Sequence, residues 1–167
     1  PQILTVNSAA LQNQSITFGS LAAKTFGDAS FSLSASATSG LGVTFSSSNG
    51  DVATVTGNTI TIVGAGLTTI TASQAGNATF NPAPNVNQTL SVNKANQTIT
   101  FNTLAAKTFG DAAFTVSATS TSGLPITFSS ANTAVATASG STVAIISAGS
   151  ANITASQSGN SNYNAAS

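Results

Sequence analysis

Most of the chain is one sequence pattern that occurs twice. The letters LAAKTFGDA stand at 21–29 and again, unchanged, at 104–112. When Gln14 is aligned with Gln97, the two copies run side by side without a gap as far as Ser167, and 42 of the 71 aligned pairs are identical. Most other pairs exchange Ile for Val, Ser for Thr or Phe for Tyr, which preserves volume and pattern. The period of 83 residues therefore predicts two copies of one small fold.

Within each copy the apolar residues alternate with polar ones, which is the period of a β-strand. In the first copy the alternating pairs are Phe31 and Leu33, Val43 and Phe45, Ile60 and Ile62, Ile70 and Ala72, and Leu90 and Val92. Turn signals rich in Gly and Asn, such as SSNG, TGNT and QAGN, separate these runs at the spacing of an all-β sandwich or barrel. Gly57 with Asn58, like Gly140 with Ser141, predicts a two-residue hairpin whose first residue has a positive φ.

Charged side chains are scarce, and their scarcity argues against several functions. The 167 residues include 3 basic and 3 acidic side chains, with no His and no Cys, and the formal net charge is 0. We expect no nucleic-acid partner and no membrane insertion, because the chain has neither a basic surface nor a long apolar run. The second copy holds a single carboxylate, Asp111. We therefore expect no catalysis, no cofactor and no metal site.

The repeated stretch carries most of the charge that the chain has. Lys24 and Asp28 flank a Thr-Phe-Gly turn, and Lys107 and Asp111 flank its copy. We interpret them as structural turn pairs that clamp a loop and contribute less than about 1 kcal/mol each. The alternative is a Lys-to-Asn isopeptide cross-link promoted by the aspartate, which would need a buried set of three side chains.

One long stretch of the first copy, VTFSSSNGDVATVTGNTITIVGAGLTTITAS, resembles the bacterial immunoglobulin-like repeats. The element KTFGD, followed by GNATFNPAP or GNSNYNAAS, is similar to the MBG repeats of YGX type, with Phe26 and Phe109 where that group usually has Tyr. The resemblance covers nearly the whole of both copies. It implies two tandem immunoglobulin-like Greek-key β-sandwiches and an extracellular or cell-surface location in a bacterium. A shared fold does not transmit an activity.

From the repeat and the resemblance together we expect a structural spacer or stalk module of a large extracellular bacterial adhesin or surface filament. Residues 1–13 would be the closing strand of a preceding repeat with a linker, 14–93 the first immunoglobulin-like repeat, and 94–167 the second, without a closing strand of its own. The junction LSVNKANQTITF contains neither Gly nor Pro. This composition predicts a short and fairly stiff hinge.

The first residues of the chain match the last strand expected in the first repeat. QILTVN at 2–7 matches QTLSVN at 88–93, with Leu4 and Val6 in the places of Leu90 and Val92. This segment is therefore expected to close a preceding domain, and the chain, which has no Met, to be an excerpt of a longer array. The alternative is a filament subunit in which Leu4 and Val6 complete the second repeat of another copy by strand donation.

Two further binding functions are alternatives. A carbohydrate-binding module needs an aromatic platform, but all nine Phe fall at repeat-equivalent positions, which predicts core positions and leaves Tyr163 as the one ring available to a sugar. An ice-binding array would use the Thr-x-Thr pairs. The second copy replaces Thr61 with Ala144 and Thr69 with Asn152, and the sheets of a sandwich twist where an ice-binding face should be flat.

Overall fold

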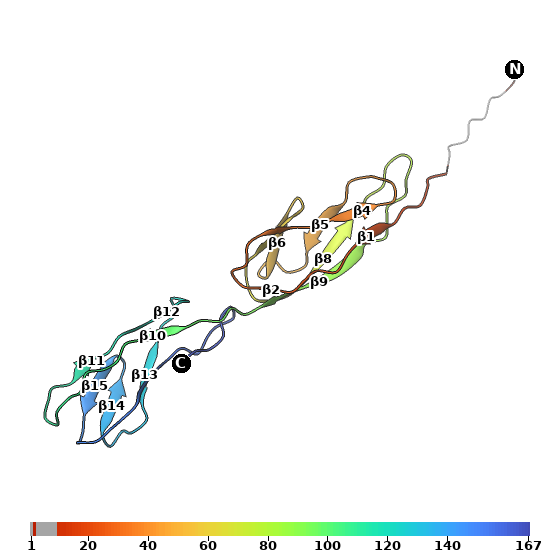
Figure 1. Ribbon diagram of the computed structural model, residues 1–167. Helices are drawn as coiled ribbons and strands as arrows, with labels where there is room; N and C mark the ends of the chain where they lie inside the picture. Colours follow the sequence, from red (N-terminus) through yellow and green to blue (C-terminus); the bar gives the residue numbers. More distant parts are fainter. Residues whose placement is uncertain (1, 3–9) are drawn as a thin grey trace. The chain divides into compact units, whose positions relative to one another are not determined.

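The computed structural model describes residues 2 and 10–167, which are all-β (Figure 1). The chain divides into two compact units, Pro1–Asn93 and Lys94–Ser167. Sixteen strands and no helix occur in the described residues, so none of these residues belongs to a helix that could cross a membrane. Leu4 and Val6, the expected donor residues, lie outside the described residues.

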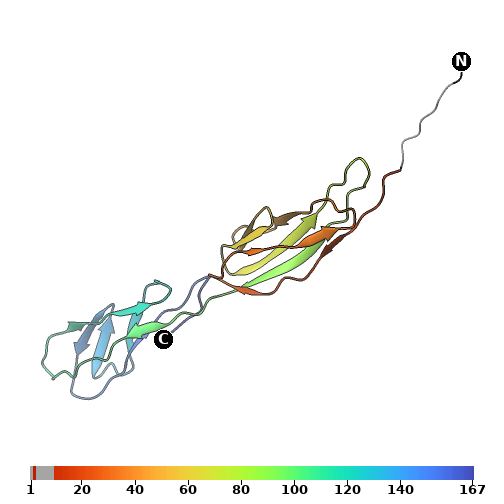
Figure 2. The ribbon, with the colours of Figure 1, turned by 45° about the horizontal axis from the view of Figure 1, so that its top comes forward.

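The first unit has nine strands in three sheets. They are β1 (Ile16–Phe18), β2 (Lys24–Thr25), β3 (Phe31–Ser32), β4 (Ala35–Ala37), β5 (Thr44–Ser47), β6 (Ala53–Thr56), β7 (Thr59–Ile62), β8 (Gly66–Ser73) and β9 (Val86–Asn93). The largest sheet has the order β2-β9-β8-β5, and the others are β3-β7-β6 and β1-β4. Figure 2 shows the yellow-green β8 and the green β9 side by side, and β2 is the only strand that pairs with β9 in parallel.

The second unit has seven strands. They are β10 (Ile99–Phe101), β11 (Phe114–Thr115), β12 (Ala118–Ser120), β13 (Thr127–Ser130), β14 (Ala136–Ser139), β15 (Thr142–Ile145) and β16 (Ile153–Ser156). Their sheets, β11-β15-β14, β13-β16 and β10-β12, repeat β3-β7-β6, β5-β8 and β1-β4 of the first unit. Within residues 94–167, β2 and β9 have no counterpart.

The all-β fold that the alternating pattern predicted is confirmed, and so is the predicted hairpin. Thr56 at the end of β6 pairs with Thr59 at the start of β7, which leaves a two-residue loop. Gly57 has a φ of +61° and its counterpart Gly140 a φ of +56°. A positive φ at the first loop position matches the right-handed twist of the strands on either side, and glycine adopts it without steric cost.

The sheets of each unit enclose an apolar core, as in a sandwich-like fold. In the first unit Ile60, Ile70 and Leu90 are fully buried. The centres of the Phe18 and Phe45 rings lie 5.4 Å apart and their planes are tilted by 57°, within the distance at which aromatic pairs attract. In the second unit Val143 is the one large side chain that is fully buried, and Val116 and Ala136 form the buried cluster with it, with partly buried side chains packed around them. The second core is therefore the more open one.

The missing counterpart of β9 accounts for this difference. Residues 66–69 of β8 pair with β9 alone, because β5 pairs with β8 only from Ile70 onward. The corresponding residues 149–152 form no strand, and β16 is half as long as β8. Likewise Lys24–Thr25 is a strand because it pairs with β9, whereas the corresponding residues 107–108 are not.

Candidate functional site

The repeated stretch folds into a tight turn that its aspartate closes. In the first unit the N–H of Asp28 donates to the carbonyl of Thr25 at 3.0 Å, and Gly27, with a φ of +93°, takes the third position of a type II turn. Oδ2 of Asp28 accepts a hydrogen bond from the N–H of Thr25 at 2.9 Å. The carboxylate therefore holds the first and last residues of the turn together.

The copy in the second unit has the same geometry. Asp111 donates its N–H to the Thr108 carbonyl at 3.0 Å and accepts from the Thr108 N–H at 3.0 Å, and Gly110 has a φ of +100°. The turn therefore forms whether or not a strand such as β9 lies beside it. Its conformation is determined by the local sequence.

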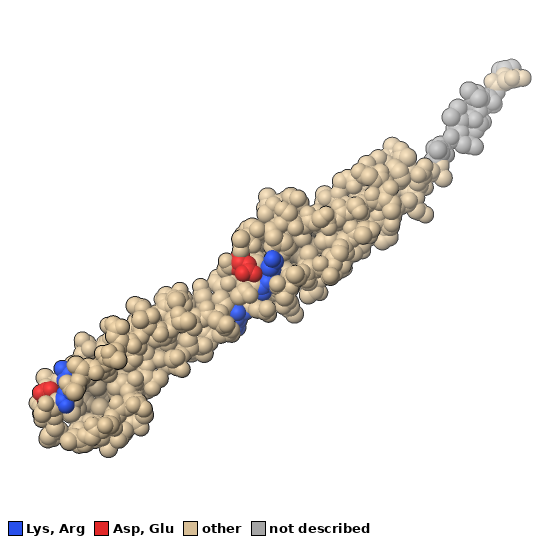
Figure 3. All heavy atoms as spheres, viewed as in Figure 1, with Lys and Arg blue, Asp and Glu red and all other residues tan. Residues whose placement is uncertain are grey.

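The two lysines of the repeated stretch contact aromatic rings. Nζ of Lys24 lies 4.7 Å from the centre of the Phe31 ring, and Nζ of Lys107 lies 5.0 Å from that of Phe114. Both are cation–π distances. In the first unit the ammonium group of Lys24 therefore lies over a ring and the carboxylate of Asp28 accepts from a backbone N–H, so each member of the expected clamp has a partner of its own. Charged side chains form a few isolated spots on the face in Figure 3.

Each unit also contains a buried glutamine network that sequence reasoning missed. Gln14 is 6% exposed; its Nε2 donates to Oε1 of Gln74 at 2.5 Å and to the Asn81 carbonyl at 2.7 Å. Its Oε1 accepts from the Ser39 hydroxyl. Buried amides need such partners, because an unpaired one is costly. The signal in the sequence was that these four residues keep their identities in the second copy.

The second unit builds the same network. Nε2 of Gln97 donates to Oε1 of Gln157 at 2.5 Å and to the Asn164 carbonyl at 2.6 Å, and its Oε1 accepts from the Ser122 hydroxyl. In the described residues, no buried side-chain nitrogen or oxygen lacks a hydrogen-bond partner. These networks join the first residues of each repeat to its last loop.

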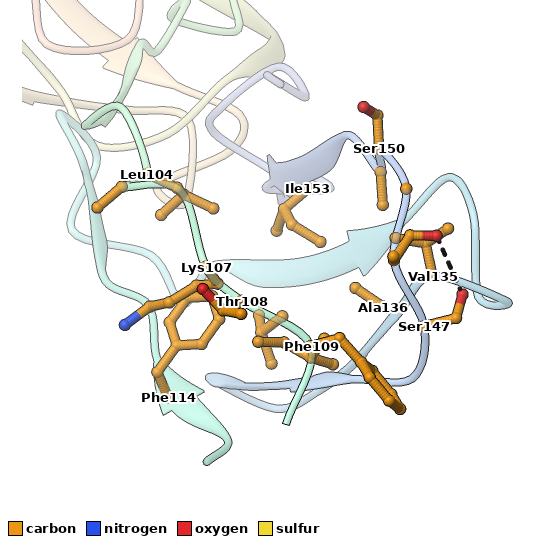
Figure 4. A pocket seen from close by; sticks show the side chains of 16 residues that line it. Leu104, Lys107, Thr108, Phe109, Phe114, Val135, Ala136, Ser147, Ser150 and Ile153 are labelled. Atoms are coloured by element: carbon orange, nitrogen blue, oxygen red, sulfur yellow. Dashed lines mark hydrogen bonds between the residues drawn. The ribbon is translucent and has the colours of Figure 1, made fainter. Parts of the chain in front are cut away.

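The second unit contains an open groove of about 590 Å³. Its lining comes from the repeated stretch (Leu104, Lys107 and Phe109), from the loop before β16 and from β16 itself. In Figure 4, Ile153 lies between the segment with Leu104 and Lys107 and the loop with Ser147 and Ser150. The corresponding place in the first unit is filled by β9, because residues 66–69 and Lys24–Thr25 pair with that strand.

Side chains beside the groove are more exposed than their counterparts. Phe109 is 64% exposed and Leu104 is 42% exposed, whereas Phe26 and Leu21 pack against the core of the first unit. The prediction that every Phe is a core residue is therefore wrong for Phe109. The prediction of a core position holds for Phe26, in the unit that contains β9. It fails for Phe109, in the unit without a counterpart of that strand.

Metal-ligating side chains and the single tyrosine were the remaining candidates for a binding site. Over residues 2 and 10–167 no three His, Cys, Asp or Glu side chains lie together. Tyr163 is half-buried, and its backbone forms a bridge with Ala95 in the last loop of the second unit.

Comparisons with protein-family models and with curated proteins find no match for the chain. The resemblance to bacterial immunoglobulin-like repeats therefore remains a proposal, and it rests on the motifs quoted above.

Proposed function

We propose that the chain is a structural spacer made of two immunoglobulin-like Greek-key sandwiches, in a large extracellular adhesin or surface filament of a bacterium. No catalytic role is part of this proposal. The observation that supports it best is that the two units share one sheet topology: every sheet of the second unit has a counterpart in the first. The turn, the glutamine network and the pair of tilted Phe rings recur with it. The repeated contacts stabilise the fold of each module, which is what a spacer that separates other domains requires.

The junction between the units is very short. β9 ends at Asn93, and Ala95 already pairs with Tyr163 and donates its N–H to the Asn162 carbonyl at 2.9 Å. Only Lys94 lies between them, and its Nζ donates to the Asn160 carbonyl at 2.7 Å. A single non-glycine residue leaves few free backbone dihedrals, which supports a junction that resists bending.

The surface also suits a spacer. The charged side chains are few, and hydroxyl and amide groups hydrogen-bond across strands instead, as between Thr71 and Asn87 at 2.9 Å. A second example joins the Ser30 and Thr61 hydroxyls at 3.1 Å. Such a surface is hydrated without charge, so its properties should change little with ionic strength. This is an advantage for a protein that meets varying salt outside the cell.

The spacer proposal is tested by the motion of the two units. Backbone ¹⁵N relaxation of the full chain should give one shared rotational correlation time for both units. In a variant with Gly-Ser-Gly-Ser inserted after Lys94, the units should tumble separately, because a flexible linker uncouples them. Independent tumbling of the two units in the unmodified chain would contradict a stiff spacer.

A further inference from the structure

The first and last segments of the first unit run in the same direction and contact each other at both ends. Gln12 forms a parallel bridge with Phe80 at one end of the unit, and β2 pairs in parallel with β9 at the other, where Lys24 lies opposite Val92. In both pairs the partner lies 68 residues further along the chain. The two segments therefore keep one parallel offset from the first contact to the last.

Hydrogen bonds of the backbone and of side chains form the contact at Gln12. The N–H of Gln12 donates to the Thr79 carbonyl, and its carbonyl accepts from the N–H of Asn81, each at 2.8 Å. Nδ2 of Asn81 donates to Oδ1 of Asn13 at 2.9 Å. The buried Gln14 donates from its Nε2 to the Asn81 carbonyl at 2.7 Å. The start of the first segment is thus bonded to Asn81 from several directions.

Two further contacts join the same segments. Nε2 of Gln88 donates to the Phe18 carbonyl at 2.9 Å, which connects β9 with β1. Directly after β2, the N–H of Phe26 donates to the Asn93 carbonyl at 2.8 Å. Figure 1 shows β1 and β2 beside β9. The hydrogen bonds between the two segments are therefore spread along the unit and not gathered at one end.

The parallel direction decides how tension along the chain acts on these bonds. Such tension pulls the first segment from its N-terminal end and β9 from its C-terminal end. In a parallel pair those two ends lie at opposite ends of the pair, so the pull shears all the hydrogen bonds at once. In an antiparallel pair they would lie together, and the bonds would break one at a time. We propose that segments 11–26 and 79–93 form a mechanical clamp, by which the first unit carries tension along the chain.

Buried side chains of β9 strengthen the mechanical clamp. Leu90 and Val92 are 0% and 3% exposed in the core, so β9 cannot slide without drawing them past their neighbours. A slip by one residue would turn both side chains to the opposite face of the sheet. The shortest slip that keeps them inside is two residues, or about 6.6 Å, which is longer than any hydrogen bond. The bonds of the mechanical clamp must therefore break before β9 can move to a new register.

The mechanical clamp goes beyond the spacer function. A spacer needs length and stiffness, whereas a mechanical clamp sets the rate at which the unit unfolds under load. Resistance to forced unfolding depends on the height of the unfolding barrier and not on the equilibrium free energy of unfolding. The mechanical clamp also lies within the first unit alone. A flexible junction would therefore contradict the spacer and leave the mechanical clamp unaffected.

Single-molecule force spectroscopy of the full chain tests the proposal, and a chain without Cys allows both attachment points to be chosen freely. The pair Ala10→Cys and Lys94→Cys loads the two segments in shear. The pair Ala29→Cys and Lys94→Cys pulls on the neighbouring ends of β2 and β9, so that they peel apart. All three positions are exposed, so the substitutions leave the core intact. At one loading rate, unfolding in shear should need at least about twice the force of peeling.

Two further variants test which contacts bear the load. Gln88→Ala removes the bond to the Phe18 carbonyl and should lower the unfolding force in the shear geometry. Thr44→Ala is the matched control: it removes a side-chain bond to the Ser73 carbonyl, outside the mechanical clamp, and should leave that force unchanged. The proposal is overturned if shear and peeling need the same force. It is equally overturned if Gln88→Ala lowers the force in shear no more than Thr44→Ala does.

Discussion

Phe26 and Phe109 occupy the same place in an identical stretch of sequence, yet Phe26 packs against the core of its unit and Phe109 is 64% exposed. The turn that holds each ring is the same, because a glycine and an aspartate shape it locally. The surroundings differ because the N–H of Phe26 donates to Asn93 of β9, which lies beside it. Local sequence therefore determines the turn, and a strand distant in sequence determines the burial of the ring.

The carboxylate of the turn should contribute measurably to stability. We expect Asp28→Ala to lower the free energy of unfolding of the first unit by on the order of 1 kcal/mol, because the Thr25 N–H loses its acceptor. Asp28→Asn keeps an acceptor oxygen and should cost less. Chemical denaturation followed by circular dichroism measures both. Equal stability of Asp28→Ala and the unmodified chain would show that the hydrogen bond contributes nothing.

Gly76 and Gly40 have almost the same φ but different surroundings. Substitution of each by Ala therefore distinguishes the cost of a steric clash from the cost of the backbone conformation. Gly76 (φ +76°) and Gly40 (φ +75°) would both be strained by a side chain, at about 1–2 kcal/mol. A Cβ on Gly76 would also lie 2.4 Å from the Phe80 carbonyl oxygen, whereas nothing lies within 4 Å of one on Gly40. Gly76→Ala should therefore destabilise the first unit clearly more than Gly40→Ala in thermal unfolding. Equal losses would contradict the tight packing of the last loop.

The repeat and its alternation were enough to predict an all-β fold, the strands and the hairpin at Gly57. The pairing of Lys24 with Asp28 could not be judged in this way, since four residues of spacing allow an ion pair in an extended loop as readily as other arrangements. The structure shows that the lysine instead reaches the ring of Phe31, seven residues later, across the turn. The turn at Gly27, with its positive φ, lies between the two residues in the chain.

Two other features escaped prediction for different physical reasons. Gln14 was not expected in the core, because glutamine is usually exposed and its partners, Gln74 and Asn81, lie far along the chain. The exposure of Phe109 was missed because repeat-equivalent positions were treated as equivalent environments. Residues at equivalent positions of the two repeats have the same surroundings only if both units contain the same strands.

The mass of the intact protein distinguishes a clamped turn from a cross-linked one. Formation of a Lys-to-Asn isopeptide bond would release one ammonia per repeat. Because Nζ of Lys24 and Nζ of Lys107 lie over aromatic rings, we expect intact mass spectrometry to give the mass of the unmodified sequence. A deficit of one ammonia that disappears in Lys24→Ala or Lys107→Ala would establish the cross-link instead.

Leu90 and Thr89 are neighbours on β9 but should respond differently to truncation. Leu90 is fully buried, so Leu90→Ala should cost the first unit about 2–5 kcal/mol. Thr89 is exposed, so Thr89→Ala should change the free energy of unfolding by no more than about 0.5 kcal/mol. Calorimetry of both variants tests this. Equal losses for the two variants would contradict the burial of Leu90 in the core of the first unit.

The stability of the second unit should rise when its groove is filled in the same chain. Extension after Ser167 by NVNQTLSVN supplies a Leu and a Val for the groove, and burial of each contributes about 1.5–3 kcal/mol before the cost of ordering the added residues. A net gain of about 2 kcal/mol would raise the melting temperature by roughly 10 °C for a unit of this size.

Tyr163 makes this measurement specific. It is the only Tyr of a chain without Trp, so its fluorescence reports the unfolding of the second unit alone. An extension that carries Asp in place of the Leu and the Val is the matched control, and it should leave the Tyr163 transition where it is. If both extensions shift the transition equally, or if neither does, the groove is not a strand site. A shift confined to the apolar extension would show that the second unit needs a strand to close its core.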